Sequence, residues 1–413
     1  MEMGIGMNKL FAVIALVFSL VSWTTAAAQD KGYYQTPALH GDTVVFSSEG
    51  DLWRGRLQGG TAVRLTTHPE VEDTPIISPD GAWIAFMASY DGPWEVYVMS
   101  INGGTPKRLT HEGGGVLLRG WMDNDRVVYR TSNLSGRLPR ILRTIDRSTL
   151  RTADLPFDNA DEVAVAEPDG GLYFTRYGLA MFADNAVQYR GGRMAQLWRG
   201  DLQSTEEATR LAANFGAPIR HPMLSNDRIY FVSDKSGADN IWSFDLNGND
   251  ARQHTARTEW QLRTPYLHEG KIVFQSGADL FVYDIAADTT QALNLFLMSD
   301  GDTSRTRWIG TPLAYLEDAR VNADGDSVAV TARGRVATAF TGQKRRIDYR
   351  FPAEDRARSA THSADGRSLY VILDADERGE IWSIPTNGQG EALQVSRGTD
   401  AHIWTLIASP HGN

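Results

Sequence analysis

The sequence predicts an all-β chain: a six-bladed β-propeller followed by the first blades of a second β-propeller. Three observations support this prediction. A polar turn that leads into an apolar strand recurs nine times, mostly at intervals of about 40–45 residues. Each interval has room for four short strands, which is the size of a propeller blade. The repeat also lapses once, after six units, and this lapse divides the chain in two.

The repeated turn carries Asp, Asn or Glu, in most units beside Gly, and the strand after it is rich in Val, Ile, Phe and Tyr. These residue types favour turns and strands respectively. The marker residues of the turns are Asp42, Asp80, Asp125, Asp169, Asp227, Glu269, Asp324, Asp365 and His411. The strands expected after the first eight turns are 44–46, 84–86, 127–129, 172–174, 229–231, 272–274, 328–330 and 369–371. The ninth unit has only its opening turn.

A second strand, rich in aromatic residues, follows the first in most units. Its examples are 51–53, 96–98, 196–198, 240–242, 279–281 and 380–382, and a Gly- or Asn-bearing turn leads from it to a third strand. The Trp and Tyr residues follow the period of the repeat, which favours buried blade core over ligand platforms. Apolar faces of adjacent blades bury one another, so a single blade is not stable alone.

Two long intervals define the organisation of the chain. The fourth unit holds an insertion, 177–195, and the repeat lapses over 293–315 before it restarts. We therefore expect a six-bladed propeller over 29–298 and an incomplete second propeller over 299–413. Closed propellers have about four to eight blades, and two units are too few to close a ring. We expect the natural polypeptide to continue beyond Asn413.

The N-terminus resembles a targeting segment. Lys9 precedes an apolar run from Leu10 to Val21, and Ala26-Ala27-Ala28 offers a cleavage site before Gln29. The run is too short for a membrane span, which needs about 20 residues. Residues 1–28 are therefore expected to be a cleavable signal peptide, without stable membrane insertion after cleavage. The mature protein is expected in the periplasm or secreted.

The bulk composition narrows the class of protein. A net charge of −10 argues against a nucleic-acid partner, and 42% hydrophobic with 22% charged residues is typical of a soluble globular protein. The sequence has no Cys, which excludes disulfides and a lipid-anchored cysteine. The nine His residues show no metal-ligand spacing. We expect no metal and no cofactor.

The second unit resembles the short strand repeats of the TolB type. This resemblance rests on Thr74-Pro75-Ile76-Ile77-Ser78-Pro79-Asp80-Gly81 and on Lys107-Arg108-Leu109-Thr110. Three further features resemble the N-terminal half of tricorn-type proteases, an S41-like serine peptidase family. They are the immediate entry into the first blade at His40, the insertion ending in Tyr189-Arg190-Gly191-Gly192, and the restart from Glu317 to Arg335.

The resemblance to tricorn-type proteases implies a six-bladed propeller, a seven-bladed one, a PDZ domain and a split catalytic core. It implies that the propellers gate or channel peptides to a downstream serine active site. The catalytic residues of the family lie in the missing core, so we expect the parent protein to be a serine-type peptidase and this chain to be inactive alone. The family grips peptide carboxylates with paired basic residues. The equivalent stretch, 111–119, lacks such a pair and offers only Arg119.

The insertion supplies the other candidate channel residues: Arg176, Tyr189, Arg190 and Arg193. Their guanidinium groups suit peptide carboxylates. The alternative, slightly favoured, is that Arg190 and Arg193 clamp the insertion onto its own blade. A basic run over 333–358 is similarly interpreted as a solvated hairpin edge rather than as a guide for acidic peptides. His111, followed by three glycines, is interpreted as part of an inter-blade loop.

No catalytic motif is recognisable in the sequence. It has no Gly-x-Ser-x-Gly elbow, and the His-Glu pairs at 111–112 and 268–269 lack a second metal-binding His. Three functions stay open. The first is the propeller region of a tricorn-like protease, with peptides or unfolded polypeptide as substrate and a possible homo-oligomer. The others are a stand-alone TolB-like interaction propeller of the envelope, and the propeller of a prolyl-oligopeptidase-type enzyme without its hydrolase domain.

Overall fold

The computed structural model describes residues 31–134, 140–166, 171–177, 187–204, 206–258, 260–301, 306, 308–351, 355–374, 379–398 and 402–409. The chain forms two compact units, 1–304 and 305–413, and each is described by itself. The predicted signal peptide, the turn at Asp169, the marker His411 and residues 178–186 of the fourth-unit insertion lie outside the described residues. The described residues contain no helix with the length and apolarity needed to cross a bilayer.

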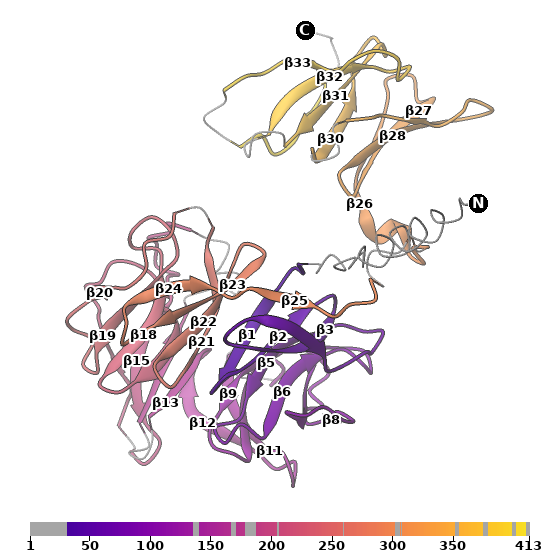
Figure 1. Ribbon diagram of the computed structural model, residues 1–413. Helices are drawn as coiled ribbons and strands as arrows, with labels where there is room; N and C mark the ends of the chain where they lie inside the picture. The colour runs from indigo at the N-terminus through magenta and orange to yellow at the C-terminus, as the bar shows by residue number, and fades with distance from the viewer. Residues whose placement is uncertain are drawn as a thin grey trace, which may run out of the picture. The chain divides into compact units, whose positions relative to one another are not determined.

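Six antiparallel sheets of four consecutive strands form the first unit, and their chain order is visible as the colour gradient in Figure 1. The sheets are β1–β4 (Gln35–His40, Thr43–Ser48, Asp51–Arg56, Gly60–Arg64), β5–β8 (Glu72–Ile77, Trp83–Ala88, Glu95–Ser100, Lys107–Arg108), β9–β12 (Val116–Trp121, Arg126–Thr131, Ile141–Asp146, Thr152–Asp158), β13–β16 (Val163–Ala166, Gly171–Arg176, Gln196–Asp201, Thr209–Arg210), β17–β20 (Arg220–Ser225, Arg228–Ser233, Asn240–Asp245, Arg252–Gln253) and β21–β24 (Leu262–His268, Lys271–Ser276, Asp279–Asp284, Thr289–Ala292). We number these sheets blades 1 to 6. The predicted all-β propeller fold is confirmed.

The expected turn of blade 2 is held by local hydrogen bonds of the kind that its sequence predicts. In blade 2, the Asp80 carboxylate accepts hydrogen bonds from Ser78 Oγ (2.6 Å) and from the main-chain N–H of Ala82 (3.0 Å). Gly81 has a φ of +73°, and a Cβ there would lie 2.5 Å from Cε1 of His40. The turn therefore needs glycine both for its backbone and for the close approach of the blade 1 histidine.

The core of the first unit consists of one apolar cluster at each junction between neighbouring blades. Phe86 and Val45 pack between blades 1 and 2, and corresponding clusters fill the junctions 2–3, 3–4, 4–5 and 5–6. The cluster around Trp53 and Val282 joins blade 6 to blade 1. Because every junction is filled, the apolar faces of the six sheets cover one another in a closed ring.

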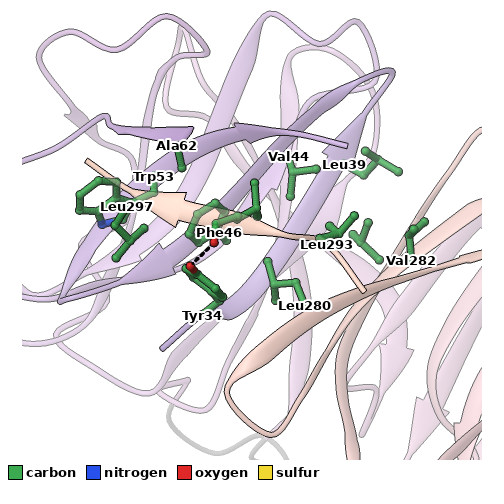
Figure 2. Close-up of a cluster of buried hydrophobic side chains, with 12 residues drawn as sticks. Tyr34, Leu39, Val44, Phe46, Trp53, Ala62, Leu280, Val282, Leu293 and Leu297 are labelled. Atoms are coloured by element: carbon green, nitrogen blue, oxygen red, sulfur yellow. Dashed lines mark hydrogen bonds between the residues drawn. The ribbon is translucent and has the colours of Figure 1, made fainter. Parts of the chain in front are cut away.

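The closing junction has a fifth strand that the other blades lack in the described residues. β25 (Leu295–Leu297) follows blade 6 and pairs in parallel with β4 of blade 1, with Leu295 opposite Gly60 and Leu297 opposite Ala62. Figure 2 shows Tyr34 with Phe46 and Leu297 in the cluster at this junction, and the Tyr34 hydroxyl donates a 2.6 Å hydrogen bond to the main-chain oxygen of Leu295. The chain before β1 and the chain after β24 are thus bonded to each other.

The second unit contains two further antiparallel sheets. They are β26–β29 (Leu316–Val321, Ser327–Ala332, Arg335–Phe340, Ile347–Asp348) and β30–β33 (Ala357–His362, Ser368–Leu373, Glu380–Pro385, Leu393–Gln394), preceded by the 3-10 helix η3 (Pro312–Tyr315). One cluster, which includes Ala329, Leu369 and Val371, packs between them. In the predicted basic run, Lys344, Arg346 and Arg358 form ion pairs with Asp326, Asp348 and Asp374.

Candidate functional site: the central channel

A cavity of about 480 Å³ lies among the first strands of all six blades of the first unit. It is lined by residues of β1, β5, β9, β13, β17 and β21, so it follows the axis of the ring. We call this cavity the channel and these six strands the inner strands. Each inner strand is also an edge strand, because it pairs on one side only within its sheet. The channel is therefore walled by the free edges of six sheets.

Four inner strands share a backbone irregularity that the repeated turns in the sequence do not predict. Each carries a residue with positive φ followed directly by proline, and the pairing register shifts there by one residue. The pairs are Thr36-Pro37, Thr74-Pro75, His221-Pro222 and Thr264-Pro265, with φ of +43°, +51°, +51° and +44° at the first residue. Proline within a sheet is tolerated at such bulges and on edges. The recurring Thr-Pro or His-Pro was the sequence signal for these positions.

Blades 3 and 4 depart from that pattern. In β9 the bulge has Arg119, followed by Gly120, and no proline. In β13 the pairing with β14 runs without a shift from Val163 to Ala166. The wall of the channel is thus asymmetric, and its two exceptional inner strands are neighbours in the ring.

Arg119, one of the predicted channel residues, lines the channel and is ion-paired. Its guanidinium bonds to the Asp161 carboxylate, which also lies 3.2 Å from Nε of Arg140 and 3.7 Å from a terminal nitrogen of Arg130. Three arginines of blade 3 thus converge on one buried aspartate of blade 4. The partner and its burial were not deducible from the sequence, because Asp161 lies 42 residues away.

Glu162 forms a second polar junction, between blades 4 and 5. Its carboxylate lies 2.9 Å from Nδ1 of His221 and accepts hydrogen bonds from the His221 main-chain N–H (2.9 Å), the Tyr177 hydroxyl (3.1 Å) and Thr175 Oγ1 (3.1 Å). Burial would raise the pKa of Glu162. The His221 imidazole and then the Arg119 guanidinium outweigh it and lower that pKa to about 2. The carboxylate is therefore ionised at neutral pH, and it fixes the imidazole beside the channel.

Two histidines meet where β1 and β21 end. The ring centroids of His40 and His268 are 4.3 Å apart, and His40 Nε2 lies 3.0 Å from the main-chain oxygen of Pro79. The Tyr266 hydroxyl donates a 3.0 Å hydrogen bond to the main-chain oxygen of Ile77. Burial and then the neighbouring His40 ring lower the pKa of His268. Blade 6 thus bonds to the end of β5, and blade 1 bonds to the turn that follows it.

The other predicted residues do not line the channel cavity. Arg176 stacks on Trp198, with its guanidinium carbon 4.3 Å from the ring centroid. Tyr189 and Arg193 are exposed. Arg190 donates hydrogen bonds to the Asp234 carboxylate (2.8 Å) and main-chain oxygen (3.0 Å), and Asp234 follows β18. The interpretation that Arg190 clamps the insertion onto its own blade is wrong, because Arg190 ties it to blade 5.

The arrangement of polar groups bears on chemistry in the channel. Within the described residues, no group of three His, Asp or Glu side chains is placed to hold a metal ion. The Glu162–His221 pair is the one His–carboxylate ion pair among the channel-lining residues that the structure describes. The hydroxyls on the wall belong to Thr36, Thr74, Thr264 and Tyr266, and no serine lines the cavity in that part of the chain.

Comparison with known proteins gives a consistent family. The family model described as the tricorn protease N-terminal beta propeller domain matches residues 31–289. A tricorn protease homolog of Saccharolobus solfataricus is 28% identical over 339 residues, which cover 78% of this chain and 30% of that protein. Tricorn protease homolog 1 of Streptomyces coelicolor is 28% identical over 400 residues, which cover 92% and 36%.

The crystal structure of the tricorn protease matches with a TM-score of 0.64 at 18% identity, over 93% of this chain and 41% of that one. At this identity the structural match shows the fold alone. The chain spans about a third of the length of the two curated relatives. Since the family model covers more than half of the residues and follows the ring of six blades, the chain belongs to the family of tricorn protease N-terminal β-propeller domains.

Proposed function

We propose that this chain is the non-catalytic propeller region of an exported tricorn-like serine protease. Its channel would gate or conduct peptides to or from a serine active site downstream. The observation that carries the proposal is the channel itself, which is walled by the inner strands of all six blades in a chain of this family. Peptides or unfolded polypeptide are the ligands that such a passage would take, and a homo-oligomer is compatible with the proposal.

The passage can be tested because the chain has no cysteine. Thr264→Cys introduces a unique thiol on the channel wall, and Asn249→Cys introduces one on the exposed turn between β19 and β20. Each variant is made in the full gene product, with any cysteine encoded beyond residue 413 replaced by serine, and is labelled with a bulky maleimide. We expect the channel label to slow hydrolysis of long peptides by at least about tenfold, and the turn label to leave it unchanged. Equal rates in both labelled proteins would contradict the proposal.

The proposal also predicts that the 413-residue chain alone has no peptidase activity. The hydrolysis of fluorogenic peptides by the pure chain is the measurement, with the full gene product as the positive control. Turnover that a serine-directed inhibitor abolishes would contradict it.

Export is proposed from the N-terminal sequence alone, and N-terminal sequencing of the mature protein tests it. Cleavage before Gln29 is the expected result.

The alternatives differ in what the gene encodes after Asn413. A stop codon there in an intact gene would favour a stand-alone, TolB-like interaction propeller. An α/β-hydrolase domain would favour a prolyl-oligopeptidase-type enzyme. Further blades, a PDZ domain and a serine-containing core would support the proposed function, and the family match favours this outcome.

A further inference from the structure

The inner edge of β13 in blade 4 has main-chain groups that no other strand uses. The Thr175 N–H donates to the Glu162 main-chain oxygen (3.0 Å), and the register then pairs Val163 with Phe174 and Ala164 with Tyr173. Antiparallel pairing alternates, so Ala164 bonds to β14 while Val163 and Val165 point their N–H and C=O groups away from it. No protein group among the described residues bonds to these groups of the two valines.

The other inner edges are closed to a further strand. β1, β5, β17 and β21 each carry a proline, which has no N–H, inside a bulge with a residue of positive φ. A bulge and a proline interrupt the row of donors and acceptors that strand addition requires. In β9 the register shifts at Arg119, and the Leu118 N–H already lies 3.3 Å from Sδ of Met87. Among the six described inner strands, β13 alone has neither a proline nor a register shift.

The surroundings of β13 leave space beside that edge. Glu162, Val163, Ala164 and Val165 all line the channel, whose volume of about 480 Å³ lies within the usual range of ligand sites, roughly 300–1,000 Å³. The nearby charges are already paired, because Arg119 bonds to Asp161 and His221 bonds to Glu162. The edge therefore offers main-chain hydrogen bonds in polar surroundings whose charges are already paired. Such an edge suits the main chain of a peptide better than a charged group.

We propose that β13 is a peptide-binding site, at which an extended segment of a peptide in the channel adds as a strand to Val163–Val165. Recognition would go through the peptide backbone, and the side chains of the peptide would contribute little selectivity. The prolines of the other four inner strands would prevent the peptide from pairing around the ring. This inference rests on the proposed passage of peptides through the channel and assigns them one docking edge.

The test uses a pentapeptide of alanine and threonine with a trifluoroacetyl cap and an amidated C-terminus, so that it carries no charge. Its dissociation constant for the whole 413-residue chain is measured by 19F NMR. Val165→Pro removes one inward N–H, at a position whose N–H is not bonded to β14. Val165→Ala is the matched control that keeps the N–H. We expect V165P to weaken binding by at least about tenfold and V165A by less than about threefold.

A second experiment uses only the wild-type chain, so its result does not depend on whether a variant folds. The same peptide N-methylated at alternate residues cannot donate along one edge, and we expect it to bind the wild-type chain at least about tenfold more weakly. Equal binding of the methylated and unmethylated peptides would overturn the inference, as would a failure of the wild-type chain to bind the capped peptide. Binding that appears only with a free C-terminal carboxylate would overturn it in favour of recognition by a cation. None of these outcomes decides the proposed function, which the labelled-channel experiment tests separately.

Discussion

Buried carboxyl groups at the junction of blades 1 and 2 set a pH-dependent stability at the scale of single residues. Burial and then the charge of Glu72 raise the pKa of Asp51 to about 7, against the effect of Arg64. Asp51 Oδ1 is buried, and no hydrogen-bond partner for it lies among the residues that the structure describes. Glu72 is fully buried, bonds to Thr66 and accepts a 2.5 Å hydrogen bond from the Tyr90 hydroxyl. The folded state therefore holds a proton on Asp51 that the unfolded chain has lost above about pH 4.

From this we predict that Asp51→Asn stabilises the protein at pH 8. A carboxyl pKa raised in the folded state contributes stability below its unfolded value and loses it as pH rises through the folded value. The wild-type chain should thus lose stability between about pH 4 and pH 7 relative to D51N. Urea unfolding should show a gain of about 1–3 kcal/mol for D51N at pH 8 and little difference at pH 4. A gain of the same size at both pH values would refute the assignment.

The His40–His268 pair changes the stability of the protein with pH in the opposite direction. The pKa of His268 is lowered in the folded state, so its contribution is present above the unfolded value of about 6.5 and is lost as the pH falls from there through the lower folded pKa. We predict that His268→Gln reduces the loss of stability of the chain between pH 7.5 and pH 5. His111→Gln is the control, since His111 is exposed in the loop before β9 and lies away from this pair. Unfolding curves at the two pH values, with the loss unchanged in H268Q, would contradict the prediction.

Single residues were also the hardest to place from the sequence. Arg119 was singled out and does line the channel, but its ion pair with Asp161 joins segments far apart in the chain. Glu162 and His221 were not singled out, because neither lies in a recognisable motif and their junction exists only once blades 4 and 5 pack together. The spacing of a repeat predicts which strand a residue is on. It does not predict which neighbour across a junction will meet it.

At the scale of elements, the turns and the two middle strands of each blade were predictable from the sequence. The inner strands, which come first in each blade, and β25 were less predictable. The predicted strands at 84–86 and 96–98 fall within β6 and β7. The inner strands are edges, and all of the described ones except β13 carry a bulge, which breaks the alternation that identifies a strand. β25 has three residues in a stretch where the repeat lapses, and its pairing with β4 depends on the closure of the ring.

The closing strand leads to a prediction about a packed pair of side chains. Leu295 is fully buried, and a Cβ built on Gly55 would lie 2.8 Å from its Cδ2. We expect Leu295→Ala to cost about 2–5 kcal/mol by leaving a cavity, and Gly55→Ala to destabilise through the clash. The double variant should recover part of this loss, since the new methyl group fills space that Leu295 vacates. Urea unfolding of the four proteins measures the coupling, and strict additivity would contradict it.

On the scale of the whole molecule, the two units differ in how completely they cover their apolar faces. Six clusters fill the junctions of the first unit, whereas the second has one cluster between its two sheets. Trp404 in the second unit is 81% exposed and Trp308 is fully exposed. Less buried apolar surface means less stability per residue. The second unit is therefore the less stable of the two.

We accordingly predict two unfolding transitions for the chain in scanning calorimetry, the lower one from residues 305–413. Leu369→Ala should lower only the first transition, by at least about 8 °C, since a loss of 1 kcal/mol shifts a domain of this size by about 4–8 °C. Leu280→Ala, in the cluster that closes the ring, should lower only the second. A single transition that both variants shift alike would show that the two units unfold together.

Among the described strands of the ring, five of the six sheets are each made from one continuous stretch of chain, and the sheet of blade 1 adds only β25 from the far end of the series. A gene carrying this arrangement can therefore gain or lose a blade by copying or deleting one continuous segment, without leaving half a sheet behind. Only the short closing segment must stay at the end of the series. Because a blade is a continuous segment, its repeat can be recognised in the sequence. For the same reason a blade can be duplicated or deleted as a whole.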